Sequence, residues 1–91
     1  MQKAIVTVLG NDRTGIIAGV TTKLSEAGIN VLDITQTIMQ DNIFVMLMLV
    51  DMEKATVSFH EAIEKLNLLG EALHVSIRIQ REEIFDAMHK I

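Results

Sequence analysis

The chain has no cysteine, no tryptophan and no tyrosine, and it has only 3 phenylalanines among its 91 residues. Without cysteine it can form no disulfide, no thiolate metal site and no cysteine nucleophile. Because aromatic residues make up only 3% of the chain, it has almost no side chains that could stack on nucleic-acid bases or on sugars. These absences exclude several common classes of binding site and catalytic site.

Positive charge is also scarce, because 8 Lys and Arg residues stand against 12 Asp and Glu residues and the formal net charge is -4. That balance argues against binding that depends on phosphate backbones or anionic lipid, so we expect no direct nucleic-acid binding and no membrane partner. No window reaches the roughly 18 consecutive apolar residues of a membrane span. The N-terminal stretch is more typical of a strand than of a signal peptide. We therefore expect a cytoplasmic protein with a single domain.

The rest of the sequence alternates between strand patterns and helix patterns. The predicted strands cover residues 4–9, 31–39, 43–50 and 73–80, and the predicted helices cover 14–27, 58–69 and 82–91. The order β-α-β-β-α-β, followed by a terminal helix, is the ferredoxin-like arrangement of the α+β class. The first and third strands are almost continuously apolar, as central strands are, whereas the second and fourth alternate. We expect an antiparallel sheet in the order 4-1-3-2 with two helices on one face.

Local signals predict where the helices begin and end. Gly28 and Gly70 are typical of helix C-termini, where a left-handed residue follows the last turn. Ser58 and Glu61 have the spacing of a capping box at the start of the second helix, although Thr56 is an alternative N-cap.

The two middle strands are expected to form a hairpin. Asp41-Asn42 suits the tight turn between them, because both residues tolerate positive φ. In the strand before this turn, Leu32, Ile34 and Ile38 are expected on one face. The strand at 43–50 is apolar on both faces, so something must cover the face that the two helices leave open. The terminal helix and a second copy of the chain are both candidates.

The segment at residues 10–16 concentrates groups that can bind a ligand. Its two glycines and two Asx residues stand at a helix N-terminus, where backbone N–H groups can receive a carboxylate. The alternative is a capped turn with Asp12 or Thr14 as the N-cap. A P-loop is excluded, because Ile16 and Ile17 stand where its Lys and Ser or Thr must be. The third glycine of the Rossmann fingerprint is also missing.

Two stretches of sequence together resemble the ACT domain, the small-molecule-sensing βαββαβ module of amino-acid metabolism. They are Gly-Asn-Asp-Arg-Thr-Gly-Ile at 10–16 and Gly-Ile-Asn-Val-Leu-Asp-Ile at 28–34. The segments at 33–37 and 84–91 are similar to a stand-alone group of single-ACT-domain proteins related to the glycine cleavage system transcriptional repressor. The resemblance covers nearly the whole chain. It implies an ACT domain at residues 1–80 and a C-terminal helix at 81–91 that packs on the domain or on a partner subunit.

The resemblance also implies a ligand site at a subunit interface. In amino-acid-binding ACT domains the ligand is held by the loop after the first strand and by an Asn at the start of the second. Carried over by position, the implied ligand-binding residues are Gly10, Asn11, Asp12, Gly15, Ile16 and Asn30, the last from the same chain or from the neighbouring one. Backbone N–H groups at Gly15 and Ile16 would bind an α-carboxylate, while Asp12 and the Asn30 carbonyl would accept from an α-ammonium.

No catalytic constellation, cofactor motif or metal site is predicted. His60 and Glu64 stand one helical turn apart, and a solvated helix face is favoured over a metal pair. An acylphosphatase-like enzyme is disfavoured because Asp12 would repel phosphate. We expect a regulatory homodimer or higher homo-oligomer, not an enzyme, that senses an amino acid or a similar small carboxylate. The alternative is a ligand-free protein–protein interaction module that regulates a metabolic enzyme or a transcription factor.

Overall fold

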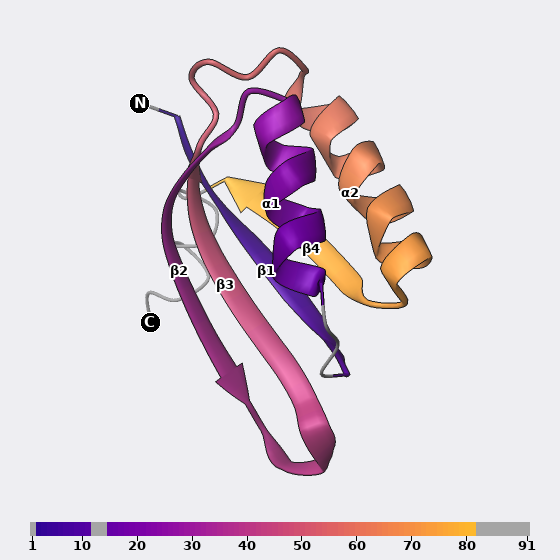
Figure 1. Ribbon diagram of the computed structural model, residues 1–91. Helices are drawn as coiled ribbons and strands as arrows, with labels where there is room; N and C mark the ends of the chain where they lie inside the picture. The colour runs from indigo at the N-terminus through magenta and orange to yellow at the C-terminus, as the bar shows by residue number, and fades with distance from the viewer. Residues whose placement is uncertain (1, 12–14, 82–91) are drawn as a thin grey trace.

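The computed structural model describes residues 2–11 and 15–81 (Figure 1). Its elements in chain order are β1 (Lys3–Asn11), α1 (Ile16–Glu26), β2 (Asn30–Ile38), a short 3-10 helix (Gln40–Asn42), β3 (Ile43–Asp51), α2 (Phe59–Leu73) and β4 (Ser76–Arg81). The strands form one antiparallel sheet in the order β2-β3-β1-β4, and both helices lie on one face of it. The ferredoxin-like fold and the predicted strand order are confirmed. The predicted helix at 82–91 lies outside the described residues.

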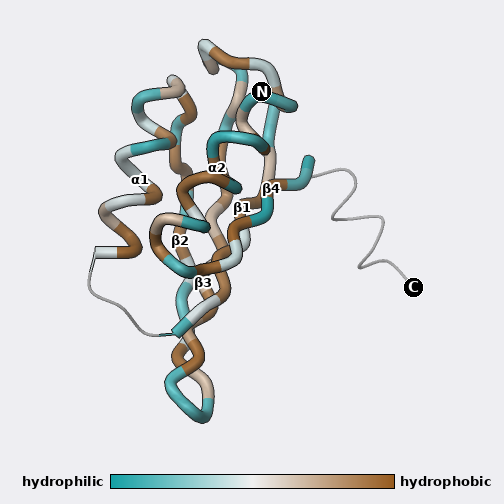
Figure 2. Tube along the Cα trace, turned by 90° about the vertical axis from the view of Figure 1, so that its right-hand side faces the viewer, coloured by the Kyte–Doolittle hydropathy of each residue, from teal (hydrophilic) through white to brown (hydrophobic). Residues whose placement is uncertain are grey.

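Aliphatic and methionine side chains fill the space between the sheet and the helices. Alternate residues of three strands point into this core, namely Ala4, Val6 and Val8 of β1, Phe44, Met46, Met48 and Val50 of β3, and Ile77 and Ile79 of β4. Figure 2 shows α1 on one side of the strands, with its hydrophobic residues turned toward them. Among the described residues no polar or charged side chain is buried. Burial of apolar surface therefore holds the two layers together.

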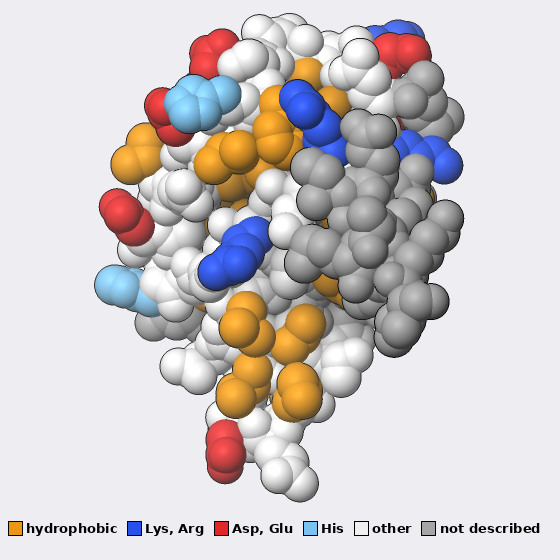
Figure 3. Space-filling view, turned by 180° about the vertical axis from the view of Figure 1, so that it is seen from behind, with side chains coloured by type: hydrophobic (Ala, Val, Ile, Leu, Met, Phe, Trp, Pro, Cys, Tyr) orange, Lys and Arg blue, Asp and Glu red, His pale blue; other side chains and the backbone are white. Residues whose placement is uncertain are grey.

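The face of the sheet that α1 and α2 leave uncovered also carries apolar side chains, as the pattern at 43–50 predicts. Ile43, Val45, Leu47 and Leu49 of β3 point away from the helices, and Leu9 of β1 pairs with Val45. Leu9, Ile43 and Leu47 are exposed. Figure 3 shows hydrophobic side chains gathered on this face near the end that carries the β2–β3 hairpin. This open face can bury further apolar surface against another element or chain.

α2 begins with the predicted capping box. Oγ of Ser58 accepts a hydrogen bond from the backbone N–H of Glu61 at 3.1 Å, and the backbone N–H of Ser58 donates to Oε1 of Glu61 at 3.3 Å. Thr56, the alternative N-cap, instead ties its loop to the end of α1, since its backbone N–H and its hydroxyl both donate to the Ala27 carbonyl. Gly28 follows α1 with φ 73°, as expected.

The hairpin between β2 and β3 turns at the predicted residues. Asp41 and Asn42 have φ values of 64° and 61°, a region that Asx residues tolerate better than most side chains. The backbone N–H of Met39 donates to the Ile43 carbonyl at 2.7 Å and closes the hairpin.

The strand β2 contains a bulge that the sequence analysis missed. Val31 pairs with Val50 and the next pair is Asp33 with Leu49, so Leu32 is an extra residue in the ladder. The prediction that Leu32 shares a face with the later apolar residues of this strand is wrong, because the bulge shifts the alternation by one residue. Val31, rather than Leu32, lies on the same face as Ile34 and Ile38.

The end of α2 also differs from the prediction. The helix continues through Gly70 to Leu73 and ends at His74, whose φ is 59°. A Cβ atom at Gly70 would lie 2.7 Å from the backbone oxygen of Val75. Gly70 is therefore required by a close contact between the helix and the chain that follows it. Because the helix is longer, the last strand begins at Ser76, three residues later than predicted.

Replacing Gly70 by Ala should lower the free energy of unfolding, although alanine is the better helix former by about 1 kcal/mol. The new Cβ would force a backbone shift at Val75, and such overpacking costs about 1–3 kcal/mol. Urea denaturation followed by circular dichroism measures the change. Gly19→Ala is the matched control in α1, where the Cβ would meet only the flexible end of Leu73 at 3.3 Å. Equal stability of the two variants would contradict the packing role of Gly70.

Candidate functional site

The turn between β1 and α1 presents backbone donors that no described side chain caps. The N-cap of α1 is Gly15, with φ 88° in the left-handed region, and the helix begins at Ile16. The alternative prediction, in which Asp12 or Thr14 is the N-cap, is therefore wrong. The first intrahelical bond runs from the Gly19 N–H to the Gly15 carbonyl, so the N–H groups of residues 16–18 lack intrahelical partners. Residues 12–14, including Asp12 of the predicted site, lie outside the described residues.

The two glycines of the turn have different surroundings. A Cβ at Gly10 would lie 2.5 Å from Cγ1 of Val75, so Gly10 permits close packing at the end of β1. A Cβ at Gly15 would meet no atom of the described residues within 4 Å. The side chain of Ile16 is buried, so this residue can offer a ligand only its backbone. Among the described residues, nothing therefore occupies the space beside Gly15 and the first N–H groups of α1, which are groups that can bind a small anion.

Asn30, the remaining predicted residue, lies at the other end of the sheet. Its register partner is Asp51, which pairs with Lys3, whereas Asn11 pairs with Ile43 at the far end. The two ends are separated by the length of β1, about 27 Å at about 3.4 Å per residue. A site formed by Asn30 and the turn of the same chain is therefore excluded. Only the form that uses Asn30 of a neighbouring chain remains a prediction.

The exposed pair on α2 is an ordinary surface contact. Nε2 of His60 lies 2.8 Å from Oε1 of Glu64, and both side chains are exposed, as expected for a solvated helix face. Within residues 2–11 and 15–81, no group of three His, Asp or Glu side chains could hold a metal ion. In the same part of the chain, no helix combines the length and the hydropathy needed to cross a bilayer.

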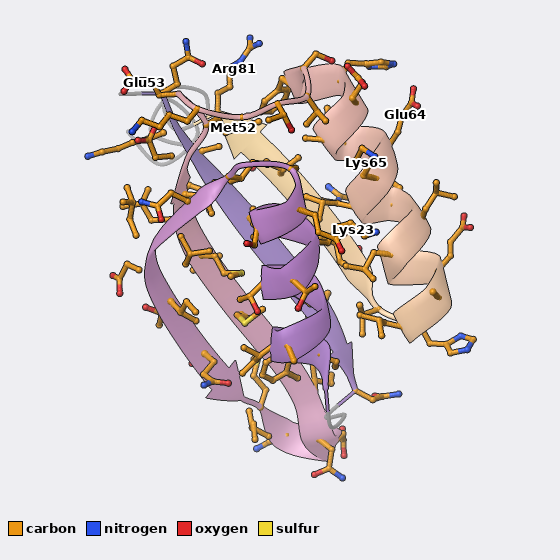
Figure 4. The ribbon with its side chains drawn as sticks, turned by 45° about the horizontal axis from the view of Figure 1, so that its top comes forward. Lys23, Met52, Glu53, Glu64, Lys65 and Arg81 are labelled. Atoms are coloured by element: carbon orange, nitrogen blue, oxygen red, sulfur yellow. The ribbon has the colours of Figure 1, made fainter. Side chains whose placement is uncertain are left out.

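A cavity of about 630 Å³ lies at the Lys3 end of the sheet, away from the predicted turn. Three of its residues, Met52, Glu53 and Arg81, are labelled in Figure 4 near the ends of β3 and β4. None of the predicted site residues is among the described residues that line it. One feature of the sequence indicates which strand ends meet at this cavity. In the predicted strand order, the start of the first strand lies beside the end of the fourth, and this brings Lys3 close to Arg81.

Known proteins resemble the chain along almost its whole length. A family model of the ACT domain matches residues 2–80. A UPF0237 protein of Listeria innocua is 51% identical over 90 residues, which are 99% of this chain and 100% of that protein. An ACT domain protein from Streptococcus pneumoniae has a TM-score of 0.81 and 39% identity, covering 92% of this chain and 93% of the other.

A fourth similarity is to the crystal structure of a protein described as a glycine cleavage system transcriptional repressor. Its TM-score is 0.70 with 30% identity, over 88% of this chain and 45% of that one. The resemblance predicted from residues 10–16 and 28–34 is confirmed by these similarities. The chain therefore belongs to the ACT domain family, and its relatives include the UPF0237 proteins.

Proposed function

We propose that the chain is a regulatory protein that binds an amino acid or a similar small carboxylate between two copies of itself. The observation that carries this proposal is the N-terminus of α1 behind Gly15, which no described side chain caps. Three backbone N–H groups and the positive end of the helix dipole lie next to Gly15, where an added Cβ would meet no atom of the described residues within 4 Å. A carboxylate supplies the negative charge and the acceptors that these donors lack. Membership of the ACT family and the similarity to a transcriptional repressor support a regulatory role.

A second copy of the chain can supply Asn30 to this end of the sheet. β2 is an edge strand, and eight of its nine residues are exposed. If two β2 strands pair antiparallel about a two-fold axis at Ile34, Asn30 of one copy lies opposite Ile38 of the other. Ile38 pairs with Phe44, and Phe44 pairs with Gly10. The partner's Asn30 then comes level with the end of β1 where the turn begins.

Apolar side chains along β2 favour this contact. Ile34 and Ile38 pair with core residues of β3, namely Met48 and Phe44, yet both remain exposed at the edge of the sheet. Burying them against a second copy would contribute about 25 cal/mol for each Å² of apolar surface. The same pairing would satisfy the backbone groups that an edge strand leaves unpaired.

A thermal-shift screen with the twenty amino acids should find at least one that stabilises the protein. A ligand at 100 times its Kd stabilises by about 2.7 kcal/mol, and we expect a Kd of roughly micromolar to millimolar for so small a ligand. In calorimetry, Asn30→Ala should weaken binding roughly tenfold or more, because an acceptor for the ammonium group is lost. Asn67→Ala, at an exposed site on α2, is the matched control and should bind normally. If no amino acid binds, the ligand-free interaction module becomes the better explanation.

Replacing Ile34 by Lys should dissociate the dimer, because the two introduced charges would meet near the two-fold axis. Leu68→Lys is the control, since Leu68 is an exposed apolar residue of α2 that lies away from β2. Analytical ultracentrifugation at micromolar concentration should give a dimer for the unaltered chain and for the control, and a monomer for Ile34→Lys. A monomeric unaltered chain would contradict the dimer. A dimer that persists in Ile34→Lys would instead implicate the open face of the sheet.

A further inference from the structure

Three pairs of residues across β1 and β3 form an apolar strip on the face of the sheet opposite α1 and α2. These residues alternate with the buried core residues of the same strands, so their side chains point away from the two helices. All except Thr7 are aliphatic, and the pairs are Ile5 with Leu49, Thr7 with Leu47, and Leu9 with Val45. Leu9 is 47% exposed and Leu47 is 38% exposed. This central strip therefore still has apolar surface to bury.

The two outer strands carry polar residues on the same face, level with the same three pairs. On β2 they are Asp33, Thr35 and Thr37, and on β4 they are Ser76, Arg78 and Gln80. The apolar strip is therefore only two strands wide, which is about 10 Å at about 4.8 Å per strand. An α-helix with its side chains is also about 10 Å across. The strip has the width that one helix covers.

The sheet of a second copy fits this face less well than a single helix does. Two sheets that stack face to face cover the outer strands as well as the inner ones. Such a contact would take the charges of Asp33 and Arg78 out of water, which costs free energy unless each charge finds a partner. The polar borders of the strip therefore favour a narrow occupant.

The chain has a segment of this size directly after β4. Residues 82–91 lie outside the described residues, and their sequence has apolar residues at helical spacing, namely Ile84, Phe85, Met88 and Ile91. β4 ends at Arg81, whose register partner Ala4 is the residue before Ile5. The segment therefore begins beside the first pair of the central strip. A helix this short is marginal in water unless its apolar side is buried.

The length of the segment sets how much of the strip it can cover. Its residues, 82–91, would span about 15 Å as a helix. The strip runs along β1 from Ile5 to Leu9, which is about 14 Å. Ile43 lies beyond that reach, because its partner Asn11 is about 20 Å from Ile5 along the strand. The segment can thus cover all three pairs of the strip but not Ile43.

We propose that residues 82–91 turn back from Arg81 as a helix and cover the central strip of the same chain. The short connection to β4 gives the segment an effective concentration in the millimolar range, well above that of a second copy at micromolar concentration. Covering the strip leaves the exposed edge of β2 as the surface through which two copies can associate. The inference does not depend on the function proposed above.

Methyl NMR on the full chain tests the contact directly. With Ile, Leu, Val and Met methyl groups labelled, nuclear Overhauser effects should join Met88 to Leu47 or Leu49, and none should join the segment to Ile43. Leu47 and Ile43 are a matched pair, since each is 38% exposed on the same face of β3. In a mixture of labelled and unlabelled chains, an isotope-filtered experiment should detect no contact between the segment and the strip.

Truncation of single side chains in the segment measures its contribution to stability. Phe85→Ala and Met88→Ala should each lower the Tm by roughly 5–10 °C, because apolar contact with the strip is lost. Asp86→Ala is the matched control, since Asp86 falls on the opposite side of the same helical pattern. It should change the Tm by less than about 3 °C.

Three results would overturn the proposal. The first is an absence of nuclear Overhauser effects between the segment and the strip in the unaltered chain. The second is their appearance in the isotope-filtered experiment, which would show that the segment covers a neighbouring copy. The third is contact between the strips of two copies, which would show that a second sheet covers this face.

Discussion

The antiparallel pairing of β1 with β3 is the contact on which the rest of the structure depends. It joins the two central strands over nine residue pairs, from Lys3 with Asp51 to Asn11 with Ile43. One face of this pair lies under the two described helices, and the other face, which these helices leave uncovered, carries further apolar side chains. The edge strands β2 and β4 attach to its outer sides, so this register decides where every candidate ligand group stands along the sheet.

That register separates two kinds of chemistry. One end of the sheet has backbone donors at Gly15 and few described side chains that could contact a ligand. The other end has a cavity whose lining residues include the cations Lys3 and Arg81. Asn30 belongs to the second end by position, although the family resemblance assigns it to the first. A second copy that runs in the opposite direction is the simplest geometry that reconciles the two.

Much of the fold could be predicted because its signals are local. The capping box depends only on the spacing of Ser58 and Glu61, and the alternation of the strands depends only on which residues are apolar. Gly70 was misinterpreted because a glycine at a helix end and a glycine in a tight helix contact look alike in sequence. The difference is the backbone oxygen of Val75, which is brought close only by tertiary packing. The bulge at Leu32 likewise becomes visible only when the register with β3 is known.

The candidate site was less predictable than the fold. The segment at 10–16 could be identified from its residues, but the N-cap at Gly15 could not, because Asp12 is a better N-cap by propensity and Thr14 is an equally good one. The cavity near Lys3 and Arg81 combines residues from both ends of the chain. The cavity can be identified only when both the strand order and the side-chain packing are known.

The oxidation of individual methionines can show how often the sheet opens. Met46 and Met48 are 0% exposed in the core, whereas Met39, beside the hairpin turn, is 56% exposed. Oxidation adds a polar oxygen to the thioether, and the described core offers it no polar side chain as a partner. Peroxide should therefore modify Met39 in the folded protein, but Met46 and Met48 only while β3 has left the core. The ratio of these oxidation rates measures how often the central strand becomes accessible to solvent.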